Sequence, residues 1–142
     1  RCAPLLARAK ASMGDMDGAL AILNSREVDK KSHSFWRLKG EILEAAEDLP
    51  SALRAYEKAR SIMPSNYSVT IAIARILARQ GKHKRALKLA DEAIGMDPRE
   101  WEPHKIKANA YHALGQEDDV ERELKDARVR LFAAGLRPDD AW

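Results

Sequence analysis

Small residues recur along this chain at a fixed interval of 34 positions. Two such series are Gly40, Ala74, Ala108 and Ala59, Ala93, Ala127. The same interval separates Pro64 from Pro98. A fixed period of roughly 20 to 50 residues is the signature of stacked structural repeats, none of which can bury its apolar face alone. The period therefore predicts a solenoid, and it favours an interaction scaffold over an enzyme.

The composition is that of an ordinary soluble protein, with 45% hydrophobic and 33% charged residues among 142. Lys and Arg number 25 against 22 Asp and Glu, and the two signs are interleaved. This balance gives weak support for an acidic partner and no case for nucleic acid. No apolar run approaches the roughly 18 to 20 residues of a membrane span, so we expect no membrane insertion. We expect a soluble chain, cytoplasmic by default, because nothing in the sequence specifies a compartment.

The 34-residue frame divides one domain, residues 1–142, into units. Three clear units are expected at 33–66, 67–100 and 101–134, each with two helices and a break between them. Gly81 and Gly115 fall at such breaks and can end a helix in the left-handed conformation. Pro50 suits the first turn of a second helix. Residues 1–32 are predicted to form a degenerate first unit, and residues 135–142 a tail after a final helix that caps the array.

Several offsets agree at once with one known family, so the chain resembles a tetratricopeptide repeat protein. The family pattern combines an early aromatic residue, small residues on both helices and a late proline. The residues that match it, or that hold the equivalent place, are Trp36, Gly40, Ala52, Tyr56, Ala59, Pro64, Ala74, Gly81, Ala86, Ala93, Pro98, Ala108, Tyr111, Gly115 and Ala127. The resemblance implies an all-α fold, a right-handed α-solenoid of stacked helix-turn-helix hairpins.

The residue types that carry catalysis or bind metals do not gather in any recognisable motif. The four histidines, His33, His83, His104 and His112, have no metal-ligand spacing around them, and we expect them to be solvated or at a rim. No phosphate-cradling glycine loop, Ser/His/Asp set or paired-cysteine motif occurs. The sequence therefore predicts no catalytic residue, no metal and no cofactor.

The resemblance also implies which side chains point into the groove formed by the first helices. Carried over by position, the candidate peptide-binding residues are Arg37, Glu41, Ile71, Arg75, Arg79, Lys105, Asn109 and His112. Guanidinium groups on a rigid framework suit bidentate capture of carboxylates, which favours an acidic peptide or protein tail. An equally weighted alternative is a solvated face whose arginines pair with glutamates of the same chain.

The leading hypothesis is a non-catalytic scaffold that holds a segment of another protein in this groove. One alternative is the regulatory or substrate-docking region of a larger enzyme or signalling protein. Two observations support it: the chain starts at Arg1 without an initiator Met, and the pair Leu5-Leu6 suggests an edge that an upstream helix covers. The other alternative is self-assembly through an edge. The sequence gives neither the identity of the partner nor the oligomeric state.

Overall fold

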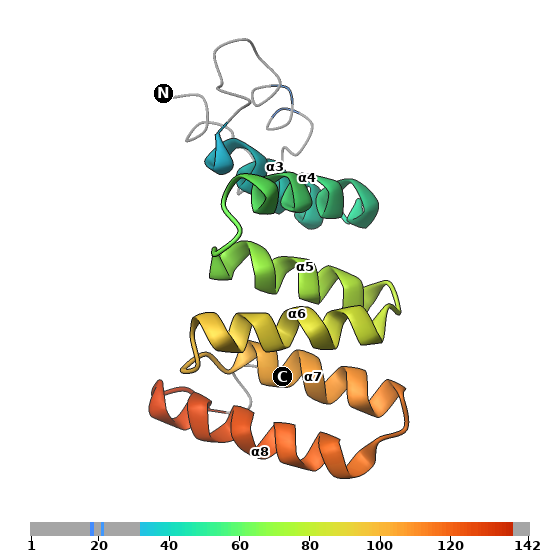
Figure 1. Cartoon of the computed structure of the whole chain (residues 1–142), viewed down its shortest axis with the longest axis vertical. Coiled ribbons are helices and arrows are strands. Elements are labelled where there is room, and N and C mark those ends of the chain that lie inside the picture. Colours follow the sequence, from blue (N-terminus) through green and yellow to red (C-terminus); the bar gives the residue numbers. More distant parts are fainter. Residues whose placement is uncertain (1–17, 19–20, 22–31, 138–142) are drawn as a thin grey trace. The chain divides into compact units, whose positions relative to one another are not determined.

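A computed structural model describes residue 18, residue 21 and residues 32–137, and these residues contain helices and turns but no strand. Six helices are placed: α3 (His33–Ala45), α4 (Leu49–Ile62), α5 (Tyr67–Arg79), α6 (His83–Met96), α7 (Glu102–Ala113) and α8 (Glu117–Ala133). Each predicted unit from residue 33 onward thus contains two helices, as Figure 1 shows. The expected degenerate unit, the Leu5-Leu6 edge and the tail beyond residue 137 lie outside the described residues.

The chain forms two compact units, Arg1–Val69 and Thr70–Trp142, whose boundary falls in the first turn of α5. Of the described helices, none is long and apolar enough to cross a membrane.

Polar side chains just before α3 and α5 cap the N-termini of these two helices. Ser32 accepts a hydrogen bond from the Phe35 amide at the start of α3, at 3.0 Å. Asn66 does the same for the Val69 amide in α5, also at 3.0 Å. Such bonds satisfy amides that have no partner within the helix. Pro50 lies in the first turn of α4, where its missing amide costs little, as the sequence predicts.

The same backbone conformation ends the first helix of each hairpin among residues 32–137. Glu47, Gly81 and Gly115 are 34 positions apart and all have positive φ, at 63°, 81° and 78°. The amide after each of them bonds back to a carbonyl of the helix, as in Lys82 N to Leu77 O at 2.9 Å. The predicted left-handed ends are confirmed at both glycines. The sequence did not reveal that Glu47 adopts the same conformation.

In the first unit, α3 and α4 pack closely enough to require a glycine. An added Cβ at Gly40 would lie 2.8 Å from the Tyr56 ring. Tyr56 is 1% exposed, and its hydroxyl donates to Glu44 Oε1 at 3.1 Å. Phe35 is the deeply buried aromatic of α3, whereas Trp36 is only half-buried and meets the Phe35 ring edge-on at 4.9 Å.

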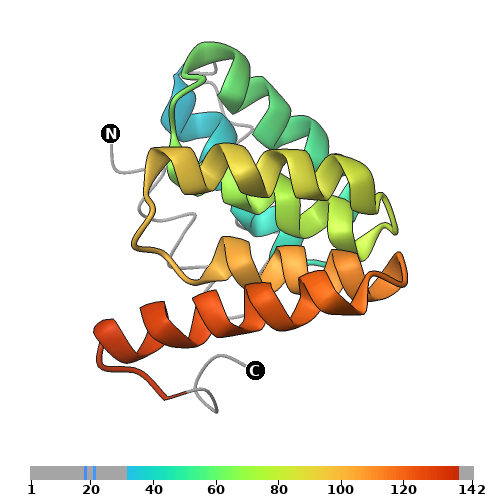
Figure 2. The ribbon, with the colours of Figure 1, turned by 60° about the horizontal axis from the view of Figure 1, so that its bottom comes forward.

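In the second unit, α6 packs against α7 and α7 against α8 (Figure 2). Small residues stand at these contacts, because they let helix backbones approach. Over both units, the predicted repeat positions that are buried are Gly40, Ala52, Tyr56, Ala59, Ala74, Ala86, Ala93, Ala108 and Ala127. Tyr111 is half-buried, and Pro64 and Pro98 are exposed in loops.

The last helix, α8, has 17 residues where α4 and α6 have 14. Phe132 occupies the place of Pro64 and Pro98, so nothing stops the helix there, and it runs on to Ala133. Phe132 is 86% exposed. On the opposite side, Glu123 is buried, although a charged residue in a capping helix would be expected at its solvated face.

Candidate functional site

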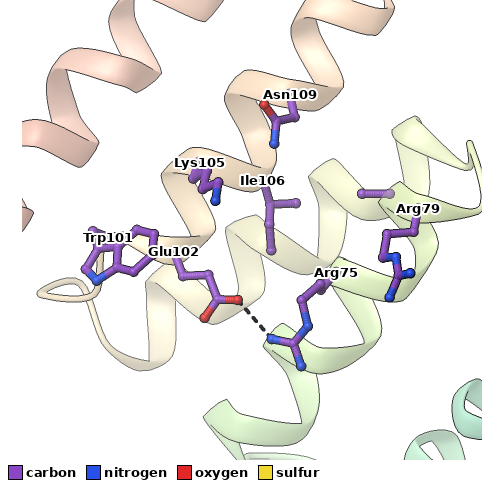
Figure 3. Close-up of a pocket in the computed structure, with 8 residues that line it drawn as sticks. Arg75, Arg79, Trp101, Glu102, Lys105, Ile106 and Asn109 are labelled. Carbon is purple, nitrogen blue, oxygen red and sulfur yellow. Dashed lines mark hydrogen bonds and ion pairs between the residues drawn. The ribbon is translucent and has the colours of Figure 1, made fainter. Parts of the chain in front are cut away.

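A cavity of about 200 Å³ opens between α5 and α7 in the second unit. Its lining carries three cationic side chains, one acidic side chain, one amide and an apolar floor. These residues are Arg75, Ala78, Arg79, Trp101, Glu102, Lys105, Ile106 and Asn109 (Figure 3). Four of the eight predicted peptide-binding residues therefore line one cavity: Arg75, Arg79, Lys105 and Asn109.

Helical spacing accounts for the way these four residues converge. Arg75 and Arg79 are one turn apart on α5, and Lys105 and Asn109 are one turn apart on α7. Residues at i and i+4 share a helix face, so each pair presents two polar groups to the same side. The cavity is consequently lined by two short polar rows, one from each helix.

Arg75 is engaged by a carboxylate of the same chain. Its Nη1 lies 2.8 Å from Glu102 Oε1, across the cavity from α5 to the first turn of α7 (Figure 3). The two side chains are 37% and 31% exposed, so solvent reaches both. This is the kind of internal pair that the sequence offered as the alternative to ligand binding.

The rest of the lining combines aromatic, cationic and apolar groups. Lys105 Nζ lies 5.9 Å from the centroid of the Trp101 ring, within the range of a cation–π contact. Ile106, which is buried, and Ala78 form the apolar floor. Trp101 and Glu102 were not among the predicted binding residues. Glu102 belongs to the same set of first-helix positions and could have been included on that ground.

The other predicted binding residues lie elsewhere. Arg37 and Glu41 belong to the first unit and pair with each other one turn apart on α3, at 3.0 Å. His112 is 73% exposed and its Nδ1 lies 3.0 Å from Glu117 Oε1. Ile71 is only 5% exposed. Ile71 does not line the cavity between α5 and α7.

A second, shallower cavity of about 330 Å³ lies at the turn between α5 and α6. Its lining consists of Gly81, Lys82, His83, Lys84, Arg85 and Leu114. The run of basic residues from 82 to 85 is the only signal of it in the sequence.

Polar side chains, two of them buried, link α6, α7 and α8 at another place. His104 Nδ1 lies 2.8 Å from Glu123 Oε2, and both side chains are under 10% exposed, at 6% and 4%. Lys107 Nζ lies 3.1 Å from Glu123 Oε1 and 2.7 Å from Asp91 Oδ1. The expectation that His104 is solvated is wrong, because Glu123 gives its ring a buried partner.

Lys107 keeps its charge in this network. Burial alone would lower the pKa of its ammonium, but the hydrogen bonds to Asp91 and Glu123 outweigh burial and raise the pKa above its ordinary value. Two members of the network, His104 and Glu123, also form a group with Asp126 in which the ligand atoms lie within 4.8 Å of one another. This is the one group among the described residues with distances suited to a metal. A cation there would meet the Lys107 ammonium, so the arrangement favours a structural ion pair.

Comparison with known sequences identifies the family. Two models described as Tetratricopeptide repeat match residues 5–67 and 43–100. The chain belongs to the tetratricopeptide repeat family, as the residue pattern predicts. No curated protein sequence matches it.

Solved structures show the same fold. A crystal structure of MamA superposes with a TM-score of 0.85 and 16% identity, over 94% of this chain and 78% of that one. The structure of MamA 41-end from Desulfovibrio magneticus RS-1 superposes with a TM-score of 0.80 and 16% identity, over 92% of this chain and 76% of that one. The fold class is thus an all-α helical repeat of the solenoid type. Family membership supports a role as a protein-interaction scaffold, and such repeats are typically non-catalytic.

Proposed function

We propose that the cavity between α5 and α7 binds an acidic segment of another protein. The observation that carries the proposal is the lining, in which Arg75, Arg79 and Lys105 face one cavity together with a single acidic residue. Arginine presents a planar fork of donors that matches a carboxylate, and two arginines one turn apart offer two such forks.

The apolar part of the lining supports a peptide over a free small anion. Trp101, Ala78 and Ile106 provide a surface on which an apolar side chain can be buried beside the carboxylate. A volume of about 200 Å³ suits one or two side chains. The proposed ligand is therefore an extended segment that carries an acidic residue next to an apolar one.

Display of random short peptides on phage, with the whole chain as bait, tests this proposal. We expect the chain to enrich peptides that contain Asp or Glu next to an apolar residue. Reversal of both arginines, Arg75→Glu with Arg79→Glu, should abolish that enrichment, because the cavity would then repel carboxylates.

A matched control reverses two exposed lysines with the same spacing on α6, Lys84→Glu with Lys88→Glu. It changes the net charge of the chain by the same amount and leaves the cavity intact, so it should keep the enrichment. Two results would contradict the proposal: peptides without acidic residues, or acidic peptides retained equally by the arginine reversal. Circular dichroism of both variants checks that the helices are preserved.

A further inference from the structure

The geometry points to Glu102 as a specificity-determining residue of this cavity: its carboxylate occupies Arg75 and must be displaced by any acidic ligand that binds there. The inference rests on the proposed function and adds a competitor within the chain. Glu102 is the only acidic residue among the eight that line the cavity. The 34-residue frame places Ser34 and Ser68 at the equivalent positions of the repeats 33–66 and 67–100. Of these three repeats, only 101–134 has an acidic residue there.

The position of Glu102 in the fold keeps its carboxylate near Arg75. The residue lies in the first turn of α7, where the partial positive charge of the helix N-terminus favours an acid. Its Oε1 lies 2.8 Å from Arg75 Nη1, although 27 positions separate the two residues. The contact therefore depends on the packing of the helices within the second unit.

The exposure of the pair allows exchange with a ligand. A fully buried pair would hold its partners against competition, whereas these side chains are 37% and 31% exposed. Pairs of this kind stabilise a protein little, because water screens both charges. A peptide carboxylate can consequently replace Glu102 at Arg75, and the net affinity is the difference between the two pairings.

Two consequences for recognition follow. A ligand carboxylate that binds Arg75 gains little there, because it exchanges with the carboxylate of Glu102. Ligands with two acidic residues can also engage Arg79 or Lys105, which line the same cavity. Glu102 thus lowers the affinity of every ligand that pairs with Arg75, and a second acidic residue offsets part of that loss.

The test measures the affinity of two fluorescein-labelled peptides for the whole chain. One peptide alternates aspartate with leucine, and the other has asparagine in place of each aspartate. Glu102→Gln keeps the shape of the side chain and removes its charge. We expect this variant to bind the aspartate peptide about two- to fivefold more tightly than the wild type does, and the asparagine peptide with unchanged affinity.

A matched variant and a double-mutant cycle separate local competition from a general change of charge. Glu121→Gln removes one exposed acid from α8 in the same unit and should leave the affinity unchanged at physiological salt. In a chain that already carries Arg75→Gln, the change Glu102→Gln should give no gain, because the competition at Arg75 no longer exists. A gain of equal size in that background would contradict the inference.

The outcomes also distinguish this inference from the proposed function. Binding of the aspartate peptide that is lost on reversal of Arg75 and Arg79 but unaffected by Glu102→Gln would overturn the inference and leave the proposed function standing. Absence of binding to the wild type and to Glu102→Gln alike would overturn the inference as well. The phage display would then decide the proposed function by itself.

Discussion

His104 and Glu123 form a buried pair that joins α7 to α8, with 2.8 Å between Nδ1 and Oε2. In the frame of the repeats, His104 replaces Trp36 and Thr70, and Glu123 replaces Ala55 and Leu89. All of these positions except Trp36 are buried. The last 34-residue repeat, residues 101–134, therefore packs a polar pair at a place where the two preceding repeats have uncharged side chains.

Removal of one member of this pair should destabilise the second unit strongly. Glu123→Ala leaves His104 without its buried partner and Lys107 with Asp91 alone. We expect a loss of about 3 kcal/mol in the free energy of unfolding, measured by urea titration, because uncompensated polar groups remain buried.

The matched control replaces both members with leucine, His104→Leu with Glu123→Leu. A buried pair exchanged for apolar side chains of similar volume often costs little. The double variant should be more stable than Glu123→Ala alone. Equal or lower stability of the double variant would mean that the pair itself stabilises the packing of α7 on α8.

Lys107 should stabilise the fold up to alkaline pH and then cease to do so. Its pKa is raised in the folded state, so the folded chain holds the proton more tightly than the unfolded chain does. The contribution is complete below the ordinary lysine pKa of about 10.4 and is lost as the pH rises through the higher folded value. The difference in unfolding free energy between the wild type and Lys107→Met should thus be constant around neutral pH and narrow above about pH 10.4.

Much of the fold is predictable from the sequence because packing constraints repeat. Ala86, Ala93 and Ala127 stand where a larger side chain would separate two helices, and all three have an exposure of 0%. The convergence of Arg75 with Lys105 follows from the same register, since both occupy first-helix positions on the same face of their units.

Other features of the fold and of the cavity could not be predicted, because the type of a residue does not always indicate whether its side chain is buried or which side chain it contacts. Glu123 is charged, so it reads as solvated, but its position in the frame is a buried one. Ile71 occupies a groove position of the family yet lies in the interior. The pairing of Arg75 with Glu102 needs the relative placement of α5 and α7, which no local pattern contains.

Replacement of Glu47 by glycine should stabilise the fold. Glu47 adopts a φ of 63°, which is unfavourable for residues with a Cβ, at the place where Gly81 and Gly115 stand in the next units. We expect Glu47→Gly to raise the free energy of unfolding by about 0.5 to 1 kcal/mol, because the relief of strain exceeds the added entropy of the unfolded chain. The converse variant, Gly81→Ala, should lower it by about 1 kcal/mol. Reduced stability of Glu47→Gly in thermal or urea unfolding would argue against strain at this turn.

The stability of the fold should depend on glycine at position 40 only when position 56 carries the tyrosine ring that faces it. An alanine Cβ would lie 2.8 Å from Tyr56 Cδ1 and Cε1, so the ring or a helix must shift. Intrinsic helix propensity favours alanine over glycine by about 1 kcal/mol, which makes the sign of the change informative. We expect Gly40→Ala to destabilise the first unit by about 1 to 3 kcal/mol through overpacking.

The 34-residue repeat at 101–134 suggests the control for this prediction, because it combines Ala108 with Leu124 at the positions equivalent to Gly40 and Tyr56. In a chain that carries Tyr56→Leu, the change Gly40→Ala should therefore be neutral or stabilising. The four unfolding free energies of this cycle isolate the interaction between the two positions from the loss of the Tyr56 hydroxyl contact with Glu44. If Gly40→Ala costs the same with leucine as with tyrosine at position 56, the Tyr56 ring is not what excludes a side chain at position 40.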